Sequence, residues 1–344
     1  MRPIHAKFPG LDLRAPALDL CTLPTPVHRL DHVSRTTGAD VWIKRDGETH
    51  AALGGSKLRA LEFLLAEFTA LRKPIVAYGP EASGWLLDLA YFGRGLDLEL
   101  LTFPMPMTEA SRHKQELLQA VAGRRLRRGR DFPEFVIRFL HSWIAVAGGR
   151  AELAPAGGSS AISTIGYVNA AFELADQVAR GDCPAPEVVV APLGSGGLVT
   201  GLALGFALAN LPVELIGVSI APWIVSNKGG VYRLLLQAAW VLNLAEPRMA
   251  RLLVTHRFKG TYGLPTPAGD RAIPLYREDG IDLDPVYSAK TAAAVLEFAR
   301  ERKQRILFWH TYRKPLLPSV LQNDRISGEP GLEGAVRASG RPTG

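Results

Sequence analysis

The sequence Ala-Leu-Gly-Gly-Ser-Lys-Leu-Arg, residues 52–59, places Lys57 after two glycines and before an apolar repeat. The glycines allow the backbone to turn tightly, and the helical spacing of the apolar residues predicts a helix that starts at Lys57. Those apolar residues are Leu58, Leu61, Leu64, Leu65 and Phe68. A lysine condenses with an aldehyde when desolvation or a nearby cation keeps part of it neutral. For this segment alone, a solvated lysine in a first helical turn is the more ordinary interpretation.

A second glycine segment, Gly194-Ser195-Gly196-Gly197, lies between the apolar run 188–191 and the apolar stretch 198–211. This order predicts a buried strand, a glycine loop and a helix. Backbone N–H groups at such a helix start bind phosphate without a charged side chain. The later glycines, Gly197 and Gly201, do not match the dinucleotide fingerprint G-x-G-x-x-G. A tight turn is the alternative, but a cradle together with a reactive lysine indicates pyridoxal phosphate.

These segments resemble the fold-type II pyridoxal phosphate enzymes, and within them the D-cysteine desulfhydrase and 1-aminocyclopropane-1-carboxylate deaminase group. The resemblance runs from about residue 20 to about residue 315. It implies an α/β fold with two lobes of mostly parallel open sheets flanked by helices, similar to the tryptophan synthase beta subunit. The segments that carry it, besides the two above, are Leu23-Pro24-Thr25-Pro26, Trp42-Ile43-Lys44-Arg45-Asp46, Gly157-Gly158-Ser159-Ser160, Tyr262-Gly263-Leu264-Pro265, Leu283-Asp284-Pro285-Val286-Tyr287 and His310-Thr311.

The resemblance implies a role for each matching residue. Lys57 would link covalently to the cofactor and later move the substrate α-proton, and Ser83 would lie beside the cofactor. Tyr262 and Tyr287 would flank the substrate and the ring, where a phenol packs on a planar group and relays a proton. A core aromatic with a satisfied hydroxyl is the alternative for either tyrosine. The remaining cofactor-binding residues that the resemblance implies are Gly194, Ser195, Gly196, Gly197, Ser288 and Thr311.

Residue 288 bears on the reaction type. The deaminase branch has a glutamate after the second tyrosine and the desulfhydrase branch has a neutral hydroxyl residue, and this chain has Ser288. A carboxylate beside the pyridine nitrogen deepens the electron sink, whereas a hydroxyl leaves it weaker. Loss of a β leaving group fits the weaker sink, and opening of a cyclopropane ring does not. The expected reaction is therefore β-elimination with deamination, or β-replacement, on a small amino acid.

Three departures from the family pattern fall at the site. Gly84 and Trp85 stand where relatives have asparagine and histidine, so the side chain that would hydrogen-bond the cofactor's ring hydroxyl is missing. Leu198 replaces a threonine of the phosphate cradle, and Tyr312-Arg313 replaces two glycines. Tyr312 and Arg313 would crowd the cofactor ring, although Arg313 could grip a carboxylate or the phosphate. Ser83, Trp85 and Arg313 are thus the candidate substrate contacts. The alternative is a catalytically silent homologue that serves as a binding or scaffold protein.

The composition fits a two-lobed enzyme, because 344 residues with 47% hydrophobic content can bury a large core. We expect a large cofactor-binding domain of residues 1–44 and 161–320 and a small domain of residues 45–160. Strands are expected at 74–78 and 97–103. Residues 321–344 are rich in Gly, Pro, Ser and charge, which predicts a flexible tail.

Several functions are disfavoured. The net charge of +7 is partly concentrated in the arginine run 124–130, which could attract nucleic acid, but no aromatic residue interleaves it. A surface helix end and loop is the preferred interpretation of the arginine run, with no nucleic acid partner.

No apolar run approaches the roughly 20 residues of a membrane span, and no signal peptide is evident, so we expect a cytoplasmic protein. Cys21 and Cys183 lack the spacing of a metal site or disulfide framework. The resemblance also implies a homodimer.

Overall fold

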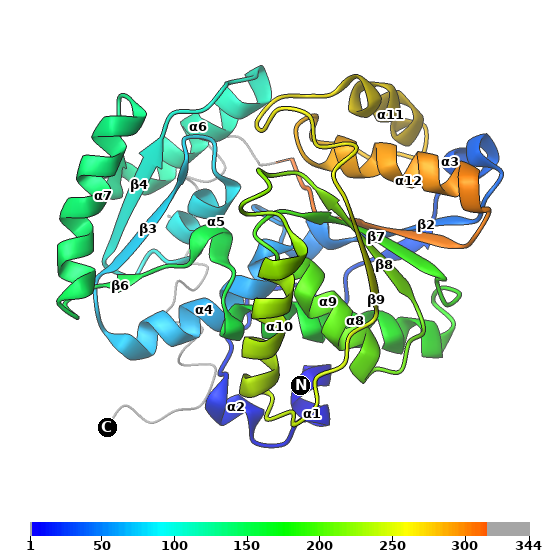
Figure 1. The fold of residues 1–344 in the computed structure, drawn as a ribbon, viewed down its shortest axis with the longest axis horizontal. Helices are drawn as coiled ribbons and strands as arrows, with labels where there is room; N and C mark the ends of the chain where they lie inside the picture. The colour runs from blue at the N-terminus through cyan, green and yellow to red at the C-terminus, as the bar shows by residue number, and fades with distance from the viewer. Residues whose placement is uncertain (1, 315–344) are drawn as a thin grey trace.

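Two separate sheets organise residues 2–314, the part of the chain that the computed structural model describes (Figure 1). The larger sheet contains β1 (Val27–Arg29), β2 (Val41–Arg45), β7 (Val188–Leu193), β8 (Glu214–Ser219), β9 (Arg251–Thr255) and β10 (Ile306–His310). The smaller sheet contains β3 (Ile75–Pro80), β4 (Leu98–Phe103), β5 (Leu126–Arg128) and β6 (Glu152–Leu153). Their strand orders are β1-β2-β10-β7-β8-β9 and β5-β4-β3-β6.

Within residues 2–314, every strand pair is parallel except β1 with β2. The predicted α/β fold with mostly parallel sheets is therefore confirmed. All strands of the smaller sheet lie inside the range 45–160 that we assign to the small lobe. The assignment of the two domains remains a proposal, and the expected tail at 321–344 lies outside the described residues.

Helices flank both sheets (Figure 1). In the larger lobe, α8, α9 and α10 lie on one side of the sheet and α3, α11 and α12 on the other. In the smaller lobe, α4 to α7 surround the sheet. The helices are α1 (Pro3–Lys7), α2 (Leu11–Arg14), α3 (Asp31–Thr37), α4 (Lys57–Leu71), α5 (Gly84–Phe92), α6 (Glu109–Ala122), α7 (Phe132–Ala147), α8 (Ala161–Arg180), α9 (Gly197–Leu208), α10 (Lys228–Val241), α11 (Pro267–Arg277) and α12 (Ser288–Arg302).

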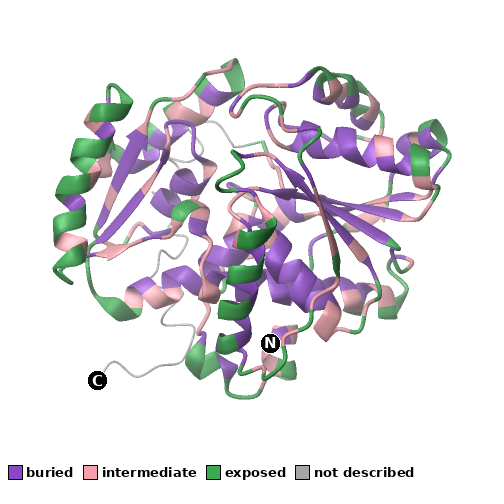
Figure 2. Ribbon diagram, viewed as in Figure 1, coloured by how far each residue is buried: buried purple, intermediate pink, exposed green. Residues whose placement is uncertain are grey.

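Strand β7 confirms that the apolar run 188–191 is a buried strand. All six of its residues are buried (Figure 2). Alternate side chains enter the cores on the two faces of the sheet. The strand leads through the glycine run into α9, as predicted. The helix ends at Leu208 rather than at residue 211, because Asn210 adopts a left-handed backbone with φ of 52°. The strands expected at 74–78 and 97–103 are present as β3 and β4.

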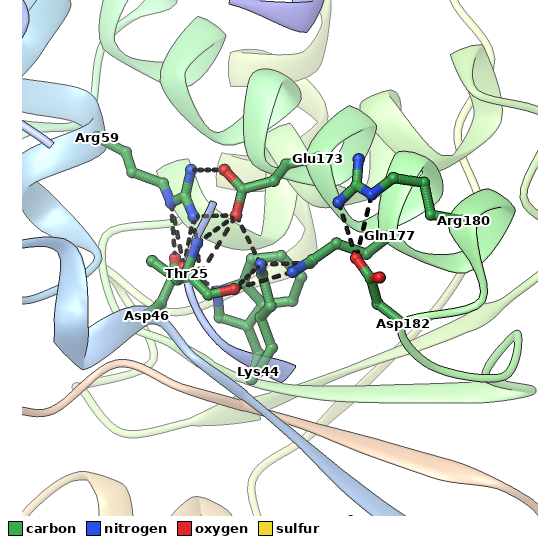
Figure 3. Close-up of polar contacts among 9 residues, drawn as sticks. Thr25, Lys44, Asp46, Arg59, Glu173, Gln177, Arg180 and Asp182 are labelled. Atoms are coloured by element: carbon green, nitrogen blue, oxygen red, sulfur yellow. Dashed lines mark hydrogen bonds and ion pairs between the residues drawn. The ribbon is translucent and has the colours of Figure 1, made fainter. Parts of the chain in front are cut away.

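A buried polar network joins the start of α4 to the larger lobe (Figure 3). Arg59 Nη2 lies 2.7 Å from Asp46 Oδ1 and 2.9 Å from Glu173 Oε1. Lys44 Nζ lies 2.6 Å from the same Glu173 oxygen. All four side chains are at most 6% exposed. Since Arg59 is two residues after Lys57, the network fixes the end of the helix that carries the lysine.

Acid is expected to weaken this network. Burial raises the pKa of Glu173, but Arg59 and Lys44 outweigh burial and hold it at about 2. Because this pKa is lower than in the unfolded chain, about 4.3, the carboxylate stabilises the fold above pH 4.3 and that stabilisation is lost as the pH falls toward 2. The difference in free energy of unfolding between wild type and Glu173→Gln should therefore shrink below pH 4.3, by about 2 kcal/mol at pH 3 and by about 3 kcal/mol below pH 2. Urea unfolding at pH 7 and at pH 3 measures this change, and a constant difference would contradict it.

Candidate active site

A cavity of about 530 Å³ opens at the carboxyl ends of β3, β7, β8 and β10. Ligands of open α/β sheets lie at this edge of the strands. The cavity is lined by segments of both lobes, including the residues that directly follow β7 and β10. All of the site residues predicted from the sequence line it: Lys57, Ser83, Trp85, Gly194, Ser195, Gly196, Gly197, Tyr262, Tyr287, Ser288, Thr311 and Arg313.

Lys57 is the first residue of α4, as the sequence predicted, and its side chain is half-buried. Burial lowers the pKa of its ammonium group, Asp88 and Asp284 oppose that change, and Lys114 adds to it. The amine is therefore neutral more often than an exposed lysine, which is the state that condenses with an aldehyde.

The glycine run forms a tight cradle with a serine from the other side of the cavity. The Ser159 and Ser195 Oγ atoms lie 2.6 Å apart, and the backbone N–H of Gly197 donates to Ser159 Oγ over 3.2 Å. A Cβ atom on Gly197 would lie 2.8 Å from Ser159 Oγ, and one on Gly157 would lie 2.8 Å from Ser195 Oγ. Only glycine leaves this space open, and hydroxyls and helix N–H groups surround it, so the cradle suits a phosphate.

Ser83 and Trp85 lie at the start of α5. Ser83 is the N-cap residue, and its Oγ accepts a hydrogen bond from Leu86 N at 3.2 Å, which leaves its hydroxyl proton for another acceptor. The Trp85 ring packs against Gly158, where a Cβ would lie 2.6 Å from the indole Cζ3. Trp85 is 3% exposed, and no hydrogen-bond partner for its Nε1 is present within residues 2–314. This buried donor is available to a group bound in the cavity.

The rings of Tyr262 and Tyr287 lie 6.1 Å apart on the cavity wall. Burial raises the pKa of both phenols, and a side-chain hydrogen bond between them opposes the rise at Tyr262. Both hydroxyls therefore keep their protons at neutral pH. One proton is engaged between the two phenols, so the pair has one left to donate to a ligand.

Ser288 and Thr311 are two hydroxyl-bearing residues of the cavity wall. Ser288 is buried at the start of α12, where its Oγ accepts from Asp284 N at 2.6 Å and donates to Asp284 O at 3.1 Å. With the proton engaged by a carbonyl, the Ser288 oxygen has a lone pair left to offer rather than a proton. Thr311 directly follows β10.

The departures from the family pattern all face the cavity. Leu198, Tyr312 and Arg313 line it. The Tyr312-Arg313 segment passes so close to Gly47 and Gly54 that a Cβ at Gly47 would lie 2.0 Å from Tyr312 O, and one at Gly54 would lie 3.0 Å from Arg313 Cδ. No ion pair of Arg313 with another residue in the range 2–314 occurs.

Sequence reasoning missed two charged residues of the cavity wall, Asp88 and Lys114, and gave no role to a third, Asp284, which lies in a matching segment. Lys114 Nζ lies 3.4 Å from Asp284 Oδ2 and 5.8 Å from the centroid of the Tyr287 ring. The available signal for Asp88 was its place as the single charged residue in the apolar helix Gly-Trp-Leu-Leu-Asp-Leu-Ala-Tyr-Phe. Ser159 was noticed as part of a matching segment, but without a role.

The arginine run forms a 3₁₀ turn (Gly123–Arg125) and the edge strand β5, rather than the expected helix end and loop. Three of its side chains make contacts within the protein. Arg125 donates to Ala90 O at 3.0 Å, while Arg128 pairs with Glu81 at 2.5 Å and Arg130 with Glu134 at 3.0 Å.

Residues 2–314 contain neither a cluster of metal-ligating side chains nor a membrane-spanning helix. No group of three or more His, Cys, Asp or Glu side chains there could hold a metal ion. No helix in that range is long and apolar enough to cross a membrane. Cys21 and Cys183 are both free thiols.

The fold and the site define a pyridoxal phosphate enzyme of fold type II. The chain belongs to the pyridoxal-phosphate dependent enzyme family, whose model matches residues 18–311. It is 33% identical over 318 residues to D-cysteine desulfhydrase of Serratia proteamaculans (strain 568), an alignment that covers 88% of this chain and 95% of the relative. D-cysteine desulfhydrase of Salmonella choleraesuis (strain SC-B67) is also 33% identical, over 319 residues.

Solved structures agree with this assignment. An ACC deaminase homologue superimposes with a TM-score of 0.75 and 28% identity, covering 91% of this chain and 95% of that chain. An L-serine ammonia-lyase from Rhizomucor miehei, with a TM-score of 0.58 and 17% identity, shares the fold. The cofactor of the family is pyridoxal phosphate, and the residues present fit it, because Lys57 and the glycine cradle line the same cavity.

Proposed function

We propose that this protein is a pyridoxal phosphate-dependent lyase that removes or replaces the β substituent of a small amino acid. The observation that carries the proposal is that Lys57, the cradle at Gly194–Gly197 and the two phenols line one cavity of about 530 Å³. This volume accommodates a cofactor together with a small ligand. Two of the relatives are D-cysteine desulfhydrases, which makes D-cysteine the first substrate to test.

Each proposed residue has a task in this reaction. Bound pyridoxal phosphate would supply the electron sink for charge developing at the substrate Cα. The Lys57 amine would take the α-proton, which its lowered pKa favours at neutral pH. The N–H groups of the glycine run, with the Ser159 and Ser195 hydroxyls, would hold the phosphate. The Ser83 hydroxyl and the Trp85 indole N–H would orient the substrate by donating hydrogen bonds to it.

The phenols of Tyr262 and Tyr287 would act on the leaving group. Because burial raises the pKa of each, both remain protonated near pH 7, and the hydrogen-bonded pair can donate one proton to a departing sulfur or oxygen. The Arg313 guanidinium, with no ion pair among the described residues, would bind a carboxylate or the phosphate.

The activity is tested by product formation. Protein loaded with cofactor is expected to convert D-cysteine and water to equal amounts of pyruvate, ammonia and sulfide, with a turnover number in the range of about 1–10³ s⁻¹. L-cysteine, D-serine and L-serine, assayed in parallel, report on chirality and leaving group. If the loaded protein forms no 2-oxo acid from any small amino acid, and no β-substituted amino acid when a thiol nucleophile is added, the proposal fails and the catalytically silent homologue is the remaining interpretation.

The homodimer and the cytoplasmic location are also part of this proposal. Support for a dimer comes from α10, whose residues Tyr232, Leu236 and Trp240 are 51%, 62% and 82% exposed. The preceding loop exposes Trp223 and Ile224. Contiguous exposed apolar side chains of this size are typical of interaction surfaces, and a second copy of the chain would cover them.

A further inference from the structure

Helix α7 is apolar on two of its sides. One side packs on the smaller sheet, where Phe135, Phe139 and Val146 join a core that includes residues of β3 and β4. On the outward side, apolar side chains recur three or four residues apart and form one stripe along the helix. The stripe consists of Phe132, Val136, Ile137, Leu140, Trp143 and Ile144, each between 36% and 68% exposed. Apolar residues gathered in this way on one surface indicate a site of interaction.

The stripe lies at the rim of the molecule. Helix α7 forms the outer edge of the smaller lobe (Figure 1), and its outward side is exposed over most of its length (Figure 2). None of the six stripe residues lines the active-site cavity, so the proposed reaction does not explain them. The helix has 16 residues and is therefore about 24 Å long. The stripe is thus a convex ridge, which a flat and deformable surface covers without having to supply a matching groove.

Positive charge gathers around this helix. Residues 123–150, which contain the arginine run and α7, include seven arginines and two acidic residues. Their net charge of +5 is most of the formal charge of +7 of the whole chain. The partner of this surface is therefore expected to be anionic as well as apolar.

Three of these arginines flank the stripe. Leu126 of β5 packs against the core that contains α5 and α6, so Arg127, the next residue, points to the opposite side of the sheet, where α7 lies. Arg130, two residues before the helix, is 88% exposed, and Arg138, within the helix, is 43% exposed. Glu134 pairs with both Arg130 and Arg138, so two guanidinium groups share one carboxylate beside the stripe.

This combination favours a lipid surface over other partners. A second copy docked on the same surface by a two-fold axis would bring the two positive segments together, which costs free energy. A nucleic acid would pair its phosphates with the arginines, but it offers nothing to the aliphatic side chains of the stripe. An anionic bilayer satisfies both features, because an interfacial helix buries its apolar side among the acyl chains while arginines reach the headgroup phosphates.

We propose that α7 docks this protein on an anionic lipid surface, with the stripe inserted at the headgroup boundary and with Arg127 and Arg130 at the lipid phosphates. The inference is separate from the proposed function, because it uses no residue of the cavity. Contact of this kind is peripheral and reversible, and it requires no membrane-spanning helix.

The test is flotation of the cofactor-loaded protein with two kinds of vesicle, one of phosphatidylcholine alone and one that also contains about a quarter of phosphatidylglycerol. The protein is expected to bind the anionic vesicles at least about tenfold more tightly than the neutral ones, because several arginines act together at the charged surface. Raising the salt concentration from about 0.05 M to about 0.5 M should weaken this binding. These measurements use the wild-type protein and so do not depend on the folding of a variant.

Variants separate the apolar contribution from the charged one. Ile137→Ser should weaken binding to anionic vesicles by about tenfold or more, because the inserted side chain loses most of its apolar surface. Its matched control is Leu13→Ser in α2, which makes the same kind of change at a residue that is 76% exposed, and which should bind within about twofold of wild type. Arg127→Gln combined with Arg130→Gln should weaken binding to anionic vesicles by roughly 10-fold and leave binding to neutral vesicles unchanged.

Losses in Ile137→Ser and in the arginine variant, with the Leu13→Ser control unchanged, support the inference. Absence of binding to anionic vesicles, or equal binding by all of the variants, would overturn it. In the absence of vesicle binding, two further measurements identify what replaces the lipid surface. A fall in the solution mass of Ile137→Ser from dimer to monomer assigns the stripe to a second copy, and binding of duplex DNA that the arginine variant loses assigns the surface to nucleic acid.

Discussion

Replacing Lys57 with alanine is expected to lower kcat/KM for the amino acid substrate by at least about 10³-fold, because the variant loses the amine that takes the α-proton. Lys57→Arg should be equally inactive, since a guanidinium keeps the positive charge but stays protonated. Steady-state kinetics on the cofactor-loaded proteins measure both effects.

The matched control is Lys73→Ala, which removes an exposed lysine shortly after the helix that carries Lys57. It should retain wild-type kinetics within about twofold. Retention of more than a tenth of the activity by Lys57→Ala would remove the lysine from the mechanism. Circular dichroism establishes that each variant has folded.

Loss of the Glu173 charge is expected to lower the free energy of unfolding by about 3–5 kcal/mol at pH 7, because Glu173→Gln leaves the buried cations Arg59 and Lys44 without their shared partner. Denaturant unfolding of the wild-type and variant proteins measures the difference. A loss of this size is diagnostic of a broken buried network.

The end of the same helix provides the control. Asp182, two residues after α8, pairs with Arg180 over 2.8 Å (Figure 3), and the two side chains are 42% and 53% exposed. Asp182→Asn should therefore cost less than about 1 kcal/mol. Equal losses for Glu173→Gln and Asp182→Asn would show that the buried network adds nothing beyond a surface ion pair.

Local patterns predicted the parts of the site that each lie within one segment. The apolar repeat after Lys57 identified the helix start, and the run 188–191 with its glycines identified β7, the loop and α9. Periodicity and glycine content act over a few residues, so a single sequence reveals them. The resemblance then supplied the residues that local patterns alone would have left as core aromatics, Tyr262 and Tyr287.

Contacts between distant segments could not be predicted in this way. Lys114 and Asp284 are 170 residues apart and meet only because α6 of one lobe approaches the loop before α12 of the other. The pairing of Glu173 with Arg59 and the contact of Ser159 with Ser195 likewise depend on tertiary packing.

The central claim is that Lys57 links pyridoxal phosphate in the cavity beside the glycine cradle. The most direct test is to add pyridoxal phosphate to purified protein, reduce with borohydride, digest, and find the modified lysine by mass spectrometry. The account predicts one added cofactor per chain, on the peptide that contains Lys57, and none in Lys57→Ala. Modification at other lysines only, or equal modification of the alanine variant, would contradict it.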